Sequence, residues 1–210
     1  MLYIDREVAQ IRLRRIDLSI QTFRVIKNQG KFLQVMAQAA GAKNILEVGT
    51  LGGYSTIFLA NALSGTKVTT IEYNHVHAEV CRKNFAMAGL GPDRVELHEG
   101  SGRDIVPKLY DEFRAGKRPQ IDFAFIDADK PSNYLYFHYA VKMARTGAVI
   151  IVDNVVRGGA IASEQEDPHG LVAGSRNAIE KVGADPRVAS TVVQTVGDKA
   201  YDGMIVAIKL

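Results

Sequence analysis

The sequence has a single cysteine, Cys81, among its 210 residues. A disulfide framework needs paired cysteines, and a zinc site needs several Cys or His ligands at a characteristic spacing, which this chain lacks. We therefore expect no disulfide and no zinc centre. Cys81 is interpreted as a buried or half-buried helix residue in a reducing compartment.

The sequence also lacks a long apolar run of the length, roughly 20 residues, that a membrane-spanning helix requires. Its first residues, MLYIDREVAQIRLRR, have no continuous apolar core of the kind found in signal peptides. We expect a cytoplasmic protein with no membrane partner.

Excess charge is small, since 26 basic and 23 acidic side chains give a formal net charge of +3. Residues 1–31 hold seven of the basic and three of the acidic side chains, which leaves 19 basic and 20 acidic residues in the rest of the chain. A DNA-binding protein is usually more basic than this, so DNA is not expected as a partner. The cluster of Arg12, Arg14 and Arg15 fits a solvated helix face, phosphate contacts with a nucleotide or RNA, or a subunit contact.

Apolar strand patterns alternate with helical patterns through the middle of the chain, which is typical of a mostly parallel sheet with helices on both faces. The expected strands are residues 44–48, 67–72, 95–99, 122–126 and 148–152. The expected helices between them are residues 54–63, 75–88, 102–113 and 133–144. This pattern predicts a doubly wound α/β fold.

The two ends of the chain depart from this alternation. Helical patterns at residues 5–25 and 30–40 predict a helical amino-terminal arm over residues 1–40. Near the other end, a helix at residues 175–182 precedes strands at 190–195 and 203–209. The short turn between these strands cannot hold the crossover that parallel strands need, so they should form an antiparallel hairpin. We expect residues 1–210 to form one domain.

Two of the expected strands end abruptly in carboxylates: Asp127 follows one apolar run, and Asp153 with Asn154 follows another. In an open α/β sheet, ligands bind at the carboxyl ends of the strands. Carboxylate and amide oxygens suit a hard cation such as Mg²⁺ rather than Zn²⁺. Lys130 would lie beside them as a possible base. In the alternative interpretation, Asp127 and Asp153 cap the helices that follow their strands.

A glycine-rich turn follows the first strand, in the segment ILEVGTLGGYS. Its glycines let a ligand approach the backbone closely, and the helix amino terminus beyond them favours anionic groups. The spacing of Gly49, Gly52 and Gly53 does not give the G-x-G-x-x-G of dinucleotide-binding enzymes. Glu47, at the end of the strand, would repel a pyrophosphate but could hold a cationic ligand. These features argue against NAD.

Glu72 ends the second expected strand. A carboxylate at this position is suited to accept hydrogen bonds from the ribose hydroxyls of a nucleoside cofactor. The alternative is that Glu72 caps the helix after it.

Four segments carry these motifs: ILEVGTLGGYSTIFLANAL, VTTIEY, FAFIDADKPSNYLYF and AVIIVDNVVRGG. Together they resemble the O-methyltransferases that depend on S-adenosylmethionine and a divalent cation, the family of the catechol and caffeoyl-CoA O-methyltransferases. The resemblance covers residues 25–210, including the closing VGDKAYDGMIVAI. It implies a Rossmann-like class I methyltransferase sheet of seven strands, with the last strand antiparallel in a C-terminal hairpin.

The resemblance also implies roles for individual residues. Those expected to bind S-adenosylmethionine are Glu47, Gly49, Gly53, Tyr54, Ser55, Glu72, Ser101, Gly102 and Asp127, with Arg103 beside the adenine position. Those that match the metal ligands are Asp127, Asp153 and Asn154, for Mg²⁺ or another divalent cation such as Mn²⁺ or Ca²⁺. Lys130 matches the catalytic base, and Asp127 shares the catalytic centre with it.

The implied reaction is methylation of one hydroxyl of a catechol-like small molecule. Mg²⁺ prefers near-octahedral coordination, so three protein oxygens would leave room for two adjacent hydroxyls of a phenolic substrate. The family also implies a homodimer. Two alternatives remain: a tRNA-modifying methyltransferase whose basic arm contacts phosphate, and a non-catalytic binding module. The binding module is disfavoured, because a decayed enzyme has no physical reason to keep Asp127, Lys130, Asp153 and Asn154 together.

Overall fold

The computed structural model describes residues 27–163, 167–196 and 201–210. The expected helix at residues 5–25 and the three clustered arginines lie outside the described residues. The helices are α2 (Lys27–Ala39), α3 (Tyr54–Ala60), α4 (His75–Met87), α5 (Gly102–Arg114), α6 (Asn133–Met143) and α7 (Leu171–Gly183), with short 3-10 helices η1 (Lys130–Ser132) and η2 (Arg157–Ala162). The strands are β1 (Asn44–Val48), β2 (Lys67–Glu72), β3 (Val95–Glu99), β4 (Ile121–Ile126), β5 (Ala144–Val152), β6 (Val188–Val196) and β7 (Tyr201–Lys209).

Seven strands form one sheet in the order β3-β2-β1-β4-β5-β7-β6. Strands β1 to β5 pair in parallel, while β7 lies antiparallel between β5 and β6. The chain builds outward from β1 through β2 and β3 and then returns to β4 on the other side of β1, which creates the switch point where such sheets bind ligands. The doubly wound fold with an antiparallel C-terminal strand is confirmed.

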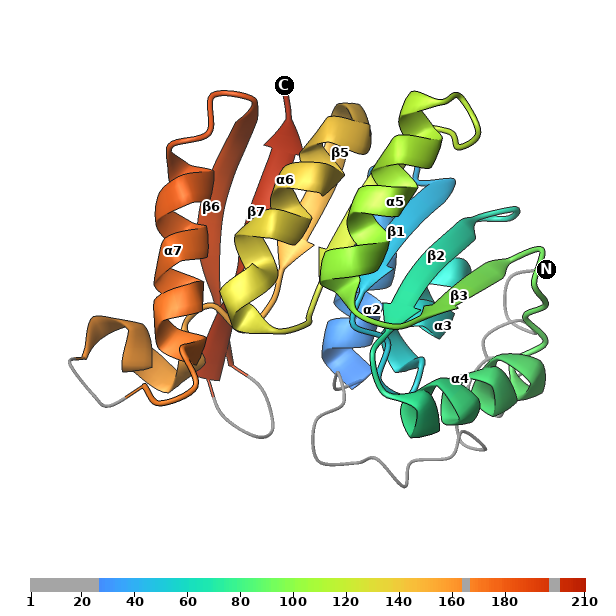
Figure 1. The fold of residues 1–210 in the computed structure, drawn as a ribbon, viewed down its shortest axis with the longest axis horizontal. Coiled ribbons are helices and arrows are strands. Elements are labelled where there is room, and N and C mark those ends of the chain that lie inside the picture. The colour runs from blue at the N-terminus through green and yellow to red at the C-terminus, as the bar shows by residue number, and fades with distance from the viewer. Residues whose placement is uncertain (1–26, 164–166, 197–200) are drawn as a thin grey trace.

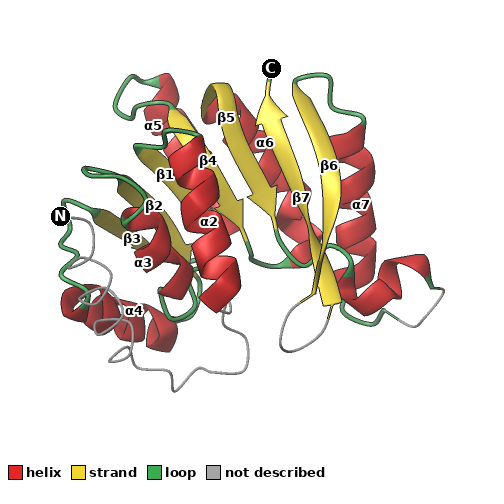
Figure 2. Cartoon of the chain, turned by 180° about the vertical axis from the view of Figure 1, so that it is seen from behind, coloured by secondary structure: helices red, strands yellow, loops and turns green. Residues whose placement is uncertain are grey.

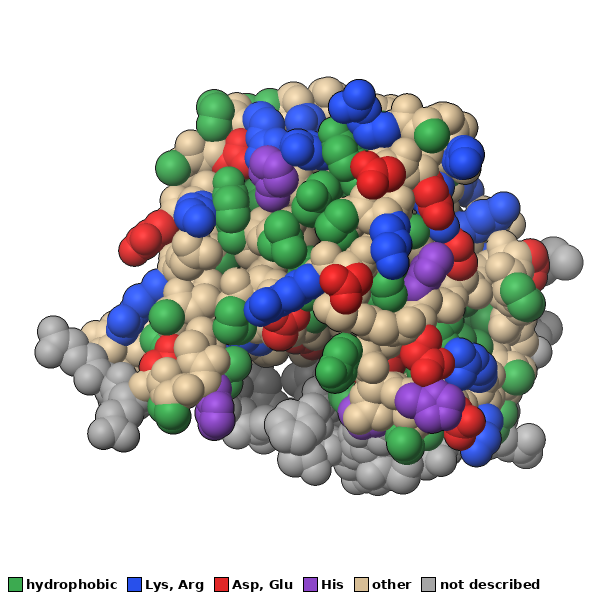
Figure 3. All heavy atoms as spheres, in the orientation of Figure 1, with side chains coloured by type: hydrophobic (Ala, Val, Ile, Leu, Met, Phe, Trp, Pro, Cys, Tyr) green, Lys and Arg blue, Asp and Glu red, His purple; other side chains and the backbone are tan. Residues whose placement is uncertain are grey.

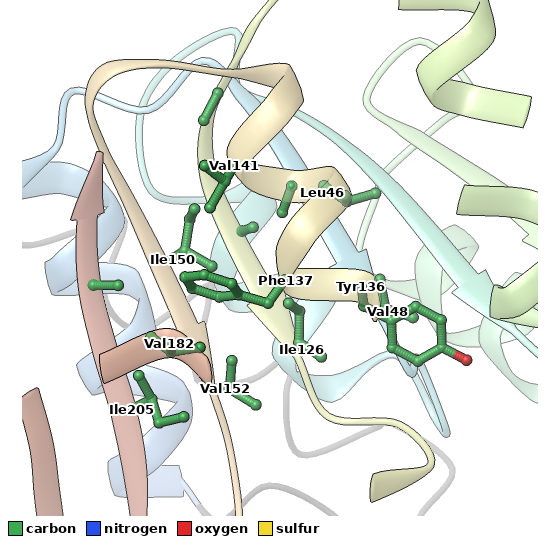
Figure 4. Packing of buried hydrophobic residues seen from close by; sticks show 14 of the residues in the cluster. Leu46, Val48, Ile126, Tyr136, Phe137, Val141, Ile150, Val152, Val182 and Ile205 are labelled. Carbon is green, nitrogen blue, oxygen red and sulfur yellow. The ribbon is translucent and has the colours of Figure 1, made fainter. Parts of the chain in front are cut away.

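Helices cover both faces of the sheet, α2 to α4 on one side and α5 to α7 on the other (Figures 1 and 2). This arrangement explains the apolar character of the central strands, since successive side chains of a strand point to opposite faces. In β4, Phe123 and Phe125 belong to the core beneath α2 to α4, whereas Ile126 belongs to the core beneath α5 to α7. On that second side, Phe137 of α6 lies over the sheet near Ile150 (Figure 4).

Several predicted element boundaries are wrong by a few residues. Strand β5 begins at Ala144 rather than at residue 148, because Ala144 pairs with Ile121 before the register shifts to Phe123 opposite Val149. The intervening residues 145–147 are polar or glycine, which hid the early start of this strand in the sequence. Helix α7 begins at Leu171 rather than at residue 175, after a left-handed Gly170. No helix in the described ranges is long and apolar enough to cross a membrane.

Candidate active site

The carboxyl ends of the parallel strands meet along one edge of the sheet, the lower edge in Figure 1. Strand β4 pairs with both β1 and β5, so the residues that follow these strands are neighbours. The ladder continues one step beyond the strands, because Asp127 N donates to Val48 O at 2.8 Å and Asp153 N donates to Ile126 O at 2.9 Å. The two acids that the sequence placed at separate strand ends therefore lie beside each other.

Lys130 connects the predicted metal ligands. Its Nζ lies 3.0 Å from Asp127 Oδ1, 3.2 Å from the backbone oxygen of Asp153 and 3.3 Å from Asn154 Oδ1. The lysine is only 5% exposed. Asp127 does not cap the helix that follows its strand, because its carboxylate pairs with Lys130 and the residue at the N-cap of η1 is Asp129. The structure brings all four predicted residues together.

The charge balance of this cluster favours a cation. Burial raises the pKa of Asp153 above its usual range, and the neighbouring Asp127 carboxylate raises it further. Lys130 lowers the pKa of Asp153 but offsets only part of this rise. Gln29 of α2 also donates its side-chain amide to Asp153 Oδ2. A bound divalent cation would stabilise both carboxylates in their charged form.

The donor set of the cluster defines which cation it could hold. Within residues 27–163, 167–196 and 201–210, no three His, Cys, Asp or Glu side chains gather as a metal site. Any cation bound here would therefore depend on the Asn154 amide as a third ligand beside Asp127 and Asp153. Such an all-oxygen set fits Mg²⁺, Mn²⁺ or Ca²⁺ and is a poor site for Zn²⁺.

Glu47 lies fully buried at the end of β1. Its Oε2 accepts hydrogen bonds from Thr56 Oγ1 at 2.5 Å and Thr70 Oγ1 at 2.6 Å, while its Oε1 has no hydrogen-bond partner among the described residues. Burial raises the pKa of Glu47 to about 7, although the neighbouring hydroxyls of Ser55, Thr56 and Thr70 oppose that rise. A buried carboxylate oxygen without a partner is costly, and a cationic ligand could satisfy it.

Glu72 holds the glycine-rich turn from β2. Its Oε2 accepts a hydrogen bond from Leu51 N at 2.7 Å, and its Oε1 accepts one from Asn74 N at 2.9 Å. The helix cap interpretation of Glu72 is wrong, because the side chain that caps α4 belongs to Asn74. Helix α4 fixes the same turn from the other side, since Asn84 Nδ2 donates to Gly52 O at 2.8 Å.

At two positions of the glycine-rich turn, the surroundings leave no room for a side chain. Gly49 has a φ of 101°, and a Cβ there would lie 2.1 Å from the backbone oxygen of Asp127. Gly53 has a φ of 78°, and a Cβ there would lie 2.5 Å from the Phe85 ring. The turn therefore passes against β4 and α4, and it leads into α3 at Tyr54.

Ser101 and Gly102 begin α5 after β3, as the resemblance placed them. A Cβ on Gly102 would lie 2.9 Å from the Tyr136 hydroxyl, which donates to Asp129 Oδ1 at 2.6 Å. Arg103 approaches the same carboxylate at 3.3 Å. Asp129, to which the sequence gave no role, thus contacts both the start of α5 and α6.

A family model described as O-methyltransferase matches residues 4–210 of this sequence. The chain belongs to the O-methyltransferase family. Two catechol O-methyltransferases are similar to it over 185 residues each. The one from Niastella koreensis is 45% identical over 88% of this chain and 81% of the relative. The one from Mycobacterium tuberculosis (strain ATCC 25618 / H37Rv) is 44% identical over 88% of this chain and 80% of the relative.

Solved O-methyltransferases share the fold. The O-methyltransferase from Bacillus cereus, in complex with SAH, has a TM-score of 0.84 and 45% identity, covering 98% of this chain and 90% of that one. The O-methyltransferase TomG from Streptomyces achromogenes, involved in tomaymycin synthesis and in complex with SAM, has a TM-score of 0.82 and 40% identity, covering 97% and 88%. The class I methyltransferase sheet expected from the sequence is confirmed.

Two residues that contact this site received no role from the sequence. Gln29 reaches Asp153 across 124 residues of sequence, and no local pattern signals such a contact. Asp129 stands inside the acidic motif at the end of β4 and could have been found there. Its hydrogen bond from Tyr136, seven residues along the chain, follows from the tight turn through η1 into α6.

Proposed function

We propose that this O-methyltransferase uses S-adenosylmethionine and a divalent cation, Mg²⁺ in the first place, to methylate one hydroxyl of a catechol-like small molecule. The observation that carries the proposal is the cluster of Asp127, Lys130, Asp153 and Asn154, joined within 3.3 Å through the lysine Nζ. The relatives named as catechol O-methyltransferases support the same substrate class.

The residues of the cluster divide the work. A cation held by Asp127, Asp153 and Asn154 would supply Lewis acidity and fix two neighbouring hydroxyls of the substrate. Lys130 Nζ already faces the ligand oxygens, so it is placed to take the proton of the reacting hydroxyl when it is present as the neutral amine. Its burial excludes bulk water from that proton transfer. Orientation of the two reactants supplies much of the rate gain.

The cofactor half lies beside this cluster on β1 and β2. We propose that Gly49, Gly53, Tyr54 and Ser55 line the methionine end of S-adenosylmethionine, and that Glu72 accepts the ribose hydroxyls. Glu47 Oε1 is buried without a partner in the described part of the chain, and a cationic group of the cofactor would satisfy it. Ser101 and Gly102 are proposed for the adenine end.

The direct test measures methyl transfer to a catechol such as caffeate by the purified protein, with Mg²⁺ and with EDTA. We expect activity with Mg²⁺ and its loss in EDTA, together with unchanged binding of S-adenosylhomocysteine by calorimetry. Asp153→Ala should lose activity in the same way. Full activity in EDTA would refute the metal assignment.

Lys130 is tested separately, by replacement with alanine. We expect Lys130→Ala to lower kcat by roughly two orders of magnitude or more, as removal of a general base does. Its Mn²⁺ affinity should stay close to that of the unchanged protein. An unchanged kcat would place the base elsewhere.

We also propose that the protein is cytoplasmic and forms one domain. We further propose that it is a homodimer with β6 at the interface. Strand β6 is the outer edge of the sheet and carries no charged side chain from Val188 to Val196, so nothing in it opposes pairing with a second copy. Light scattering should give twice the monomer mass, and Val193→Lys should give the monomer. A monomeric unchanged protein would refute this.

The tRNA alternative gains no support from the described residues. On the face covered by α5, α6 and α7, Lys and Arg side chains lie among Asp and Glu side chains (Figure 3). The basic cluster of Arg12, Arg14 and Arg15 lies outside the described residues.

A further inference from the structure

The chain makes an unusual turn immediately after the proposed metal ligands. Asn154 and Arg157 both have a φ of 55°, a left-handed conformation that residues other than glycine rarely adopt. Two such residues within one short segment cost free energy, and they persist only where the surroundings hold them. Asn154 contributes both this strained backbone and the side-chain oxygen that faces Lys130 Nζ at 3.3 Å.

The group that holds this turn comes from the start of β7. Asp202 Oδ1 accepts hydrogen bonds from Val156 N at 3.0 Å and from Arg157 N at 2.7 Å. The same oxygen accepts one from Gly203 N at 2.8 Å, and Val155 N donates to Gly203 O at 2.9 Å. The three consecutive backbone amides after Asn154 are thus all held by the start of β7. Gly203 O accepts from the first, and Asp202 Oδ1 accepts from the other two.

The backbone at Gly203 is tightly packed against its neighbours. A Cβ on Gly203 would lie 2.4 Å from Val156 Cγ2 and 2.9 Å from the backbone oxygen of Val193. The backbone of β7 therefore runs directly against the segment that follows Asn154. On the opposite side of that segment, Asp153 N is fixed to Ile126 O at 2.9 Å. Asn154 is held between these two anchors.

We propose that Asp202 is a positioning residue for the reaction: its carboxylate fixes the turn at residues 155–157 and thereby aims the Asn154 amide at the cation site. This inference rests on the proposed function, since it assigns Asp202 to the same site. Asp202 acts through the backbone and needs no contact with substrate or cofactor. Outer residues that orient metal ligands typically change metal affinity by roughly 10- to 100-fold when they are removed.

The test compares Asp202→Ala, Asp202→Asn and Asp185→Ala with the unchanged protein, at a temperature where all are folded. Mn²⁺ affinity and S-adenosylhomocysteine affinity are measured by calorimetry, and kcat is measured with a catechol. Asp185→Ala is the matched control, because the buried Asp185 also accepts several bonds, from Arg187 N at 3.0 Å and Arg187 Nε at 2.8 Å, but lies beyond the far end of α7.

We expect Asp202→Ala to weaken Mn²⁺ binding by roughly tenfold or more and to lower kcat, with S-adenosylhomocysteine affinity changed by less than about twofold. Asp202→Asn keeps an acceptor oxygen and should restore most of the Mn²⁺ affinity. Asp185→Ala should lower the melting temperature and leave Mn²⁺ affinity unchanged. A merely structural Asp202 would behave like Asp185.

Two outcomes separate the inference from the proposed function. If the unchanged protein binds no Mn²⁺, the proposed function fails. If it binds Mn²⁺ and Asp202→Ala binds it equally well, only the inference is overturned. Should Asp202→Ala not fold, Gly203→Ala tests the link between the turn and the cation site, because its added Cβ displaces Val156 within the turn. Unchanged Mn²⁺ affinity in a folded Gly203→Ala would also overturn the inference.

Discussion

Replacement of Gly49 by alanine should damage the protein far more than the same replacement at Gly52. The two glycines belong to one turn and differ in surroundings. A Cβ on Gly49 would lie 2.1 Å from Asp127 O and 2.7 Å from Asp127 C, whereas a Cβ on Gly52 would meet nothing within 4 Å. Gly49 also has a φ of 101°, which an alanine adopts only with strain, while Gly52 is not among the residues with positive φ.

The cost of Gly49→Ala follows from two effects. Placing alanine in a backbone conformation with positive φ costs about 1–2 kcal/mol. Forcing an extra carbon into a packed position costs about 1–3 kcal/mol, and the atoms contacted here are backbone that cannot rotate away. The free energy of unfolding should therefore fall by roughly 2–5 kcal/mol, which lowers the melting temperature by roughly 5–20 °C in a protein of this size. Gly52→Ala should stay within about 0.5 kcal/mol of the unchanged protein.

The assay combines thermal unfolding with methyl transfer at a temperature where both variants are folded. Relief of the contact must move Gly49 or Asp127, so Gly49→Ala should lose methyl transfer even while folded. Gly52→Ala should unfold at nearly the same temperature as the unchanged protein. Equal melting temperatures for the two variants would refute the reasoning from the close approach of Gly49 to the Asp127 backbone.

Two further predictions concern carboxylates on strands of the sheet, Glu47 on β1 and Asp122 on β4. The pKa of Glu47 in the folded protein, about 7, lies above its ordinary 4.5, so the folded state binds this proton more tightly than the unfolded state does. The protonated Glu47 therefore adds to the free energy of unfolding. This contribution is fully present below about pH 4.5 and is lost as the pH rises through about 7. Glu47→Gln should remove this pH-dependent loss, which is worth roughly 3 kcal/mol. Chemical denaturation at several pH values between 4.5 and 7 measures it, and an equal slope of unfolding free energy against pH in both proteins would contradict the idea. At the amino ends of the strands, Asp122 accepts hydrogen bonds from Lys43 N and Asn44 N, both at 2.8 Å, and pairs with Arg145 at 2.7 Å. Asp122→Ala should therefore lower the free energy of unfolding by roughly 2–4 kcal/mol in urea denaturation, with unchanged S-adenosylhomocysteine affinity in calorimetry; a loss of cofactor affinity would contradict its purely structural role.

The sequence could predict the fold because its signals are local. Apolar runs of strand length alternate with helical patterns, and three of the expected strands, β1, β2 and β3, have the bounds that the structure shows. The early start of β5 could not be predicted, because it depends on the pairing of Ala144 with Ile121 and on a register shift between neighbouring strands. Such a shift arises from contacts across the sheet and leaves no periodic trace in one segment.

The candidate site was predictable for the same reason, up to a limit. Asp127, Asp153 and Asn154 each follow a recognisable strand, and parallel strands bring their carboxyl ends to one edge. The supports of the site were not predictable, because Gln29 and Asp202 reach it from elements far away in sequence. Neither residue stands in a pattern that suggests chemistry, and only the three-dimensional arrangement gives either of them a role.

Asp127 links the two halves of the candidate site, and this explains why damage at the glycine-rich turn should also reach the cluster around Lys130. Its N donates to Val48 O at 2.8 Å, its backbone oxygen lies against Gly49, and its carboxylate pairs with Lys130 at 3.0 Å. Methyl transfer requires the donor and the acceptor to be held in line, and a displacement on the order of 1 Å can cost about 100-fold in rate. A single strand end that touches both the glycine-rich turn and Lys130 fixes the relation between them through the backbone. The positions of Gly49 and Asp127 are therefore coupled, so double variants at the two should show non-additive losses of kcat.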